Sequence, residues 1–91
     1  IDRIEERPDG SKVLVEIKNR TNRLFRKVVD YEMIQVQVYL QMLGLTHARL
    51  VEQYNSQVAS HDITRDEEMW QNVIVPGLEE FCRELNQCLG E

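Results

Sequence analysis

The chain has 91 residues, of which 42% are hydrophobic, and its formal net charge is −5. This length allows one small domain with a single core. No run of about 18 apolar residues occurs, so we expect no membrane-spanning helix.

Charge is unevenly distributed along the chain. Residues 1–51 carry nine basic and seven acidic side chains, whereas residues 52–91 carry two basic and nine acidic ones. The segment from Lys18 to Lys27 carries five positive charges and no negative one. Such a run is either a solvated loop or a segment that contacts phosphate groups, and both interpretations stay open at this point.

The first predicted element is a β-hairpin. Residues 1–6 are a strand candidate, and the sequence RPDGS that follows is typical of a three-residue loop, residues 8–10, with a glycine bulge. KVLVEIKNR, residues 12–20, is then the returning strand. If Arg7 faces Ser11, paired residue numbers sum to 18, and Asp2 lies directly opposite Glu16.

Alternate residues of a strand share a face. Glu16 and Lys18 therefore project together, on the same side as Leu14. We expect the core on the opposite side, where the returning strand carries Val13, Val15 and Ile17. A surface salt bridge between Glu16 and Lys18 is the simplest interpretation of this pair.

A helix is predicted next, with Asp30 as its N-cap and Gly44 directly after its last residue, Leu43. We expect it to be largely buried, because it carries apolar residues on two faces: Ile34, Val38 and Met42 on one, Val36, Leu40 and Leu43 on the other. Its polar-aromatic stripe consists of Tyr31, Gln35 and Tyr39.

Two further strands are predicted, HARLVEQY at residues 47–54 and a weaker edge strand at residues 58–63. Thr64 or Asp66 then caps a last helix that runs to about Leu89, and Pro76 should kink or split it. The apolar residues that repeat at helical spacing in this helix are expected in the core: Trp70, Ile74, Leu78, Phe81, Leu85 and Cys88.

The cysteines and histidines give no metal or disulfide pattern. Cys82 and Cys88 lie six residues apart in the last helix, and we interpret them as small apolar residues of a protein in a reducing, intracellular compartment. His47 and His61 stand alone and are interpreted as surface or strand-end residues. The element order strand, strand, helix, strand, strand, helix predicts a mixed α/β fold with about four strands flanked by helices.

Asp2 and Glu16 would repel each other on neighbouring strands unless a cation neutralised them. Oxygen ligands without imidazole or thiolate suit Mg²⁺ or Mn²⁺, and the backbone carbonyl of Ile17 could add a further ligand. The ammonium group of Lys18 would then lie beside a metal-bound water or an attacked phosphate. This combination favours phosphodiester hydrolysis.

Asp2 followed by Glu16-Ile17-Lys18 resembles the core motif of the PD-(D/E)XK nuclease superfamily. The run YEMIQVQVYLQMLGL is similar to the helix after the active strand in its YqaJ and lambda-exonuclease (RecB-type) branch. HARLVEQY and HDITRDEEMWQNVIVPGLEEFCREL resemble that branch's following strand and its C-terminal strand and helix. The resemblance therefore covers nearly the whole chain.

The resemblance implies a restriction-endonuclease-like core over residues 1–91. Asp2 and Glu16 correspond to metal ligands and Lys18 to the catalytic lysine, while Gln35 supports the site and Tyr31 helps to place it. The family usually has an N-terminal helical region before this core. We expect that this part is missing here, or that a second copy or a partner chain supplies it.

The leading hypothesis is a Mg²⁺- or Mn²⁺-dependent DNA nuclease, most simply an exonuclease of recombination, repair or replication. Its basic segment would contact the DNA backbone without reading bases, through Arg20, Arg23, Arg26 and Lys27. Two alternatives remain: a non-catalytic nuclease-like binding or assembly module with the acidic last helix as its interface, and an unrelated α/β scaffold with a surface salt bridge.

Overall fold

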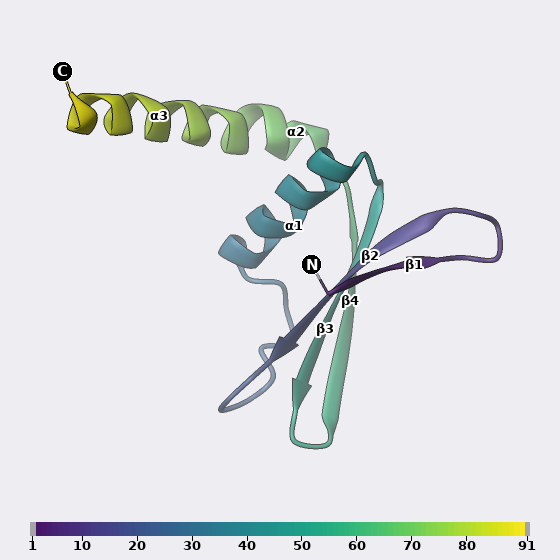
Figure 1. Ribbon diagram of the computed structural model, residues 1–91. Coiled ribbons are helices and arrows are strands. Elements are labelled where there is room, and N and C mark those ends of the chain that lie inside the picture. Colours follow the sequence, from purple (N-terminus) through teal and green to yellow (C-terminus); the bar gives the residue numbers. More distant parts are fainter. Residues whose placement is uncertain (1, 91) are drawn as a thin grey trace.

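The computed structural model describes residues 2–90 and contains one four-stranded sheet with helices (Figure 1). In chain order the elements are β1 (Arg3–Glu6), β2 (Lys12–Asn19), α1 (Asp30–Leu43), β3 (His47–Tyr54), β4 (Gln57–Thr64), α2 (Glu67–Met69), the π-helical turn η1 (Trp70–Ile74) and α3 (Val75–Leu89). The predicted mixed α/β class and element order are confirmed.

The strands lie in the sheet in the order β1-β2-β3-β4. β1 and β2 are antiparallel, β2 and β3 are parallel, and β3 and β4 are antiparallel. Parallel neighbours need a crossover connection, and α1 supplies it between β2 and β3. β4 is an edge strand, as predicted.

The hairpin has the predicted register. Ile4 is paired with Leu14, and Arg3 with Val15, so paired numbers sum to 18. Gly10 adopts a φ of 90° and donates its N–H to the carbonyl of Arg7 at 2.9 Å. The loop therefore positions β1 so that Asp2 reaches the part of β2 that carries Glu16.

The apolar core lies between α1 and the sheet. It contains Leu14, Val36, Leu40, Ala48, Leu50 and Ile63. Val13 and Val15 are buried, as predicted. The cluster that packs against α1 lies on the other side of β2 and includes Leu14, which the sequence did not place in the core.

The ends of α1 are set by local backbone geometry. Gly44 adopts the left-handed conformation with a φ of 66°, as predicted for a residue that ends a helix. The prediction of Asp30 as N-cap is wrong, because Val29 precedes the helix and Asp30 already lies in its first turn. The expectation of a largely buried helix is wrong as well, since Ile34, Met42 and Leu43 are exposed.

The last helical region begins at Asp66, whose carboxylate accepts the N–H of Met69 at 3.0 Å. The π-helical turn η1 lies directly before Pro76, which has no N–H to donate and disturbs the preceding turn. α3 projects away from the sheet (Figure 1). The prediction of a buried apolar stripe therefore holds for Ile74, and Trp70 is half-buried. It is wrong for the other members, which are exposed: Leu78, Phe81, Leu85 and Cys88.

Candidate functional site

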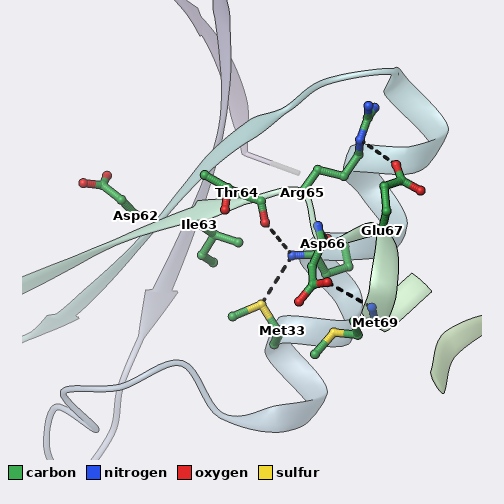
Figure 2. A pocket seen from close by; sticks show the side chains of 9 residues that line it. Met33, Asp62, Ile63, Thr64, Arg65, Asp66, Glu67 and Met69 are labelled. Carbon is green, nitrogen blue, oxygen red and sulfur yellow. Dashed lines mark hydrogen bonds and ion pairs between the residues drawn. The ribbon is translucent and has the colours of Figure 1, made fainter. Parts of the chain in front are cut away.

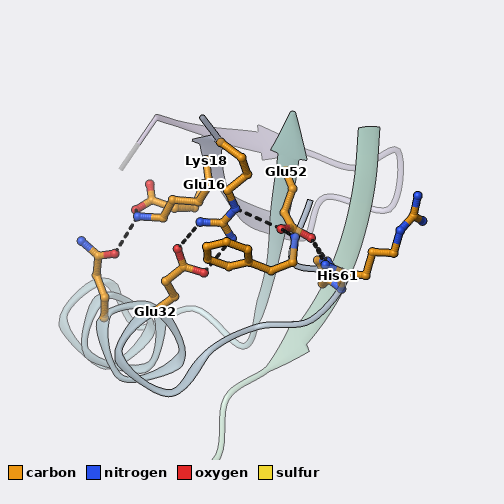
Figure 3. Close-up of polar contacts among 9 residues, drawn as sticks. Glu16, Lys18, Glu32, Glu52 and His61 are labelled. Carbon is orange, nitrogen blue, oxygen red and sulfur yellow. Dashed lines mark hydrogen bonds and ion pairs between the residues drawn. The ribbon is translucent and has the colours of Figure 1, made fainter. Parts of the chain in front are cut away.

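Glu16 and Lys18 lie near the carboxyl end of β2, on the sheet face that α1 covers. Figure 3 shows their side chains next to each other. The ammonium of Lys18 lies 3.7 Å from Oε2 of Glu16, and the Glu16 side chain is only 6% exposed. The carboxylate of this ion pair is therefore buried, whereas the simplest interpretation of the sequence placed the pair on the surface.

Gln35 brings α1 into contact with this pair. Lys18 donates to Oε1 of Gln35 at 3.0 Å, and the amide nitrogen of Gln35 lies 3.5 Å from the hydroxyl of Tyr39. Lys18 therefore lies between a carboxylate and a carboxamide, which together orient its ammonium group. Tyr39 is a residue that sequence reasoning placed in the stripe but not in the site.

Asp2 reaches the same strand from β1. Its Oδ2 accepts the backbone N–H of Ile17 at 2.6 Å. This hydrogen bond lowers the pKa of the Asp2 carboxyl below its ordinary value, and the positive charge of Lys18 acts in the same direction. Asp2 is therefore held as a carboxylate beside Glu16, although its side chain is exposed to solvent.

The donor set fits a hard divalent cation. Asp2 and Glu16 offer carboxylate oxygens, and Mg²⁺ is commonly held by one or two carboxylates while it keeps several waters. Among residues 2–90 no group of three histidine, cysteine or acidic side chains could hold a metal ion. Ile17 contributes its N–H to Asp2, and its carbonyl as a metal ligand stays a prediction.

Tyr31 lies one helical turn before Gln35, and 69% of its surface is exposed. The tyrosine hydroxyl that meets Gln35 belongs instead to Tyr39, one turn further along α1. The role of Tyr31 in the site stays a prediction.

Arg20 directly follows β2 and has a different environment from the one predicted. Its guanidinium forms a two-pronged ion pair with Glu32 at 2.6 and 2.9 Å and donates to Glu52 at 3.0 Å. The ring of Phe25 lies 3.8 Å from it, and its side chain is 7% exposed. The hydrogen bonds that Arg20 donates to the Glu32 carboxylate raise the pKa of Arg20 above its ordinary value. We therefore do not expect Arg20 to contact DNA, because its side chain is buried and pairs with the carboxylates of Glu32 and Glu52.

Glu52 lies in the middle of β3 and is 0% exposed. Burial by itself would raise its pKa, but hydrogen bonds from His61, from Arg20 and from the N–H groups of Phe25 and Arg26 outweigh this effect and lower the pKa to about 2. His61 makes its contact from β4 at 2.8 Å (Figure 3). The interpretation of His61 as a surface residue is wrong for this reason.

The other three predicted DNA-contacting residues, Arg23, Arg26 and Lys27, are exposed. Arg23 lies 5.6 Å from the ring of Phe25, and Arg26 has a φ of 58°. These three cations follow each other closely in the connection between β2 and α1. They are therefore free to meet a polyanion, unlike Arg20.

A pocket of about 490 Å³ lies away from Lys18, between α1, the end of β4 and the start of α2 (Figure 2). Gln37, on its floor, donates to the carbonyl of Thr64 at 3.0 Å and accepts the N–H of Asp66 at 2.8 Å. Both ends of its carboxamide thus connect α1 to the last helical region. The pocket contains none of the predicted catalytic residues.

No described helix has the length and apolar character needed to cross a lipid bilayer.

Comparison with known proteins adds information on the fold. No family model matches the sequence, and no curated protein matches it significantly. The crystal structure of SSO0001 superposes with a TM-score of 0.57 at 23% sequence identity, over 72% of this chain and 32% of that one. At this identity the likeness shows a shared fold, and the chain spans about a third of the length of that structure.

Proposed function

We propose that this chain is the core of a metal-dependent DNA nuclease of the PD-(D/E)XK type, acting as an exonuclease. The observation that supports the proposal is the position of Lys18, with its ammonium 3.7 Å from Glu16 and 3.0 Å from Gln35. A lysine held by two polar groups beside a pair of carboxylates is suited to phosphodiester hydrolysis.

In this proposal Asp2 and Glu16 hold Mg²⁺ or Mn²⁺. When bound, such a cation polarises a phosphoryl oxygen and lowers the pKa of its water. Lys18 donates a hydrogen bond to the phosphate, where negative charge increases in the transition state. Gln35 positions the lysine, and Tyr39 holds the other end of the Gln35 carboxamide. The N–H of Ile17 keeps the Asp2 carboxylate aimed at Glu16.

The first test is cleavage of end-labelled linear duplex DNA in Mg²⁺ or Mn²⁺, with a covalently closed circle in parallel. Lys18→Ala should lower the rate by roughly 10²- to 10³-fold, the range for removing one hydrogen-bond donor to charge that develops in the transition state. Lys12→Ala, an exposed lysine on the same strand, is the matched control and should keep the wild-type rate. Equal rates for the Lys18→Ala and wild-type proteins would refute the assignment of the lysine.

If no cleavage is observed, metal binding distinguishes the remaining possibilities. A cation that binds the native state raises thermal stability. The nuclease proposal predicts a Mg²⁺- or Mn²⁺-dependent increase in melting temperature that Glu16→Ala abolishes. An unrelated α/β scaffold predicts no increase in either protein.

A non-catalytic binding or assembly module is the second candidate. The exposed apolar side chains of α3 favour it, since Leu78, Phe81 and Leu85 lie outside the core. Binding alone does not require the Asp2, Glu16, Lys18 and Gln35 arrangement, so we rank it second. A second copy or a partner chain that completes the DNA-end contacts is compatible with either candidate.

A reducing, intracellular compartment is part of the proposal, because it would keep the exposed thiols of Cys82 and Cys88 reduced.

A further inference from the structure

The buried carboxylate of Glu52 takes part in four hydrogen bonds, none of them part of the backbone ladder of the sheet. Oε1 accepts from Arg20 at 3.0 Å and from the N–H of Phe25 at 2.7 Å. Oε2 accepts from the N–H of Arg26 at 2.9 Å and lies 2.8 Å from Nε2 of His61. A carboxylate has about four acceptor sites, so all of them are occupied and Glu52 is not available as a metal ligand.

A buried carboxylate is costly, and well-packed apolar residues often replace such groups without loss of stability. The core residue Leu50, two positions earlier on the same face of β3, shows that this sheet face accepts apolar side chains. What distinguishes Glu52 is the identity of its partners. Three of the four donors belong to residues 20–26, in the connection between β2 and α1.

This connection, residues 20–29, contains no helix or strand. The two adjacent N–H groups that Glu52 accepts are those of Phe25 and Arg26. Arg26 has a φ of 58°, a left-handed conformation that is uncommon for residues other than glycine and needs support from its surroundings. The Phe25 ring packs over Arg20 at 3.8 Å and so adds a second attachment to the same buried cluster.

We propose that Glu52 is a positioning residue for nucleic-acid binding: it holds this connection in the conformation that presents Arg23, Arg26 and Lys27 to a DNA phosphate backbone. The side chains of Arg23, Arg26 and Lys27 are exposed, whereas the buried Arg20 side chain pairs with Glu32 and Glu52. The inference rests on the proposed function for its partner, DNA, but not for any catalytic step.

The test measures binding of a labelled duplex oligonucleotide in EDTA, so that cleavage does not occur, at several salt concentrations. Each lost phosphate contact reduces the slope of log affinity against log salt by about 0.9. Glu52→Gln leaves at least one backbone N–H without its acceptor. We expect it to reduce the slope by about two to three and so to weaken binding by about 10²- to 10³-fold at 0.1 M salt.

Glu32→Gln is the matched control. Glu32 is also buried and also pairs with the Arg20 guanidinium, but within the described residues 2–90 no backbone N–H of the connection donates to it. It should leave the salt slope unchanged. A general loss of stability would affect both variants alike, whereas a change of slope in Glu52→Gln alone identifies positioning.

Two further measurements test whether Glu52 acts through the conformation of the connection. Amide hydrogen exchange at Phe25 and Arg26 should accelerate in Glu52→Gln and not in Glu32→Gln. The triple variant Arg23→Ala/Arg26→Ala/Lys27→Ala should lose as much slope as Glu52→Gln, and combining both changes should cause no additional loss.

Additive losses, an unchanged slope in Glu52→Gln, or wild-type binding that does not depend on the three cations would each overturn the inference. Binding that follows the predicted pattern, with neither cleavage nor the Glu16-dependent stabilisation by Mg²⁺ or Mn²⁺, would refute the nuclease proposal and leave this inference intact. Cleavage that depends on Lys18 but binding that ignores Glu52 would do the reverse.

Discussion

Lys18, near the end of β2, and Arg20, directly after β2, have different electrostatic environments. Lys18 contacts one carboxylate, Glu16, and one neutral carboxamide, Gln35. Arg20, two residues later, is enclosed by the carboxylates of Glu32 and Glu52. The arginine's planar guanidinium can satisfy both carboxylates at once, whereas the single ammonium of Lys18 remains able to serve a substrate. The two positive charges therefore have separate roles, structural for Arg20 and proposed as catalytic for Lys18.

The pH dependence of stability is a prediction at the scale of Glu52. Its folded-state pKa is about 2, below the ordinary value of 4.5. Its stabilising contribution is therefore complete above about pH 4.5 and is lost as the pH falls toward 2, with a total of roughly 3 kcal/mol. Urea unfolding at pH 7, 4 and 2.5 measures this loss.

The charged groups that face Glu52 are Arg20 and His61, with Glu32 on the far side of Arg20. Glu52→Gln should flatten the acid part of the stability curve. Glu79→Gln, on the exposed surface of α3, should leave it unchanged. A wild-type curve that stays level from pH 4.5 to pH 2.5 would contradict the prediction.

At the scale of elements, α1 is the part that assembles the candidate site. Its Gln35 meets Lys18 of β2, and its Glu32 meets Arg20 directly after the same strand. Its buried residues Val36 and Leu40 pack on the sheet. A small shift of α1 would therefore separate Gln35 from Lys18. The residues that fix the ends of α1 thus affect the geometry of the candidate site.

Gly44→Ala should destabilise the fold by about 1 kcal/mol, because a side chain is disfavoured in the left-handed conformation. The φ of Gly44 is 66°, and an added Cβ would meet nothing within 4 Å, so the cost comes from the backbone alone. For a domain of this size the melting temperature should fall by about 4–8 °C. Gly44→Asn is the control and should cost less, because asparagine tolerates this conformation. Equal melting temperatures for Gly44→Ala and wild type would contradict this account.

On the scale of the whole molecule, two groups of apolar residues contrast with each other. One forms the core between α1 and the sheet, and the other lies exposed along α3, which extends away from the sheet (Figure 1). The exposed group thus contributes little to folding of the described residues. The apolar stabilisation of the sheet and of the candidate site therefore comes from the core and not from α3.

This division predicts a contrast between two substitutions. Leu50→Ala should lower the free energy of unfolding by about 2–5 kcal/mol, since Leu50 is 0% exposed within the core. Phe81→Ser should change it by less than about 0.5 kcal/mol, since 60% of Phe81 is exposed. Denaturant unfolding of both variants measures the contrast, and a large loss for Phe81→Ser would show that α3 packs against the body.

The sequence by itself determined those features that depend on neighbouring residues. The loop at residues 8–10 requires a left-handed glycine, and once it is placed the period of two fixes the register of β1 on β2. Gly44 ends α1 for the same local reason. The placement of Glu16, Lys18 and Gln35 near one another followed from these elements together with the stated family resemblance.

The tertiary structure alone decided which charged residues are buried and which apolar residues are not. Arg20 meets Glu52, 32 positions away in sequence, and Glu52 meets His61 across the β3–β4 pair. Periodicity carries no information on such partners, because it records only which residues share a face. Helical spacing likewise predicted an apolar stripe on α3, but whether another element covers that stripe depends on the direction in which the helix leaves the sheet.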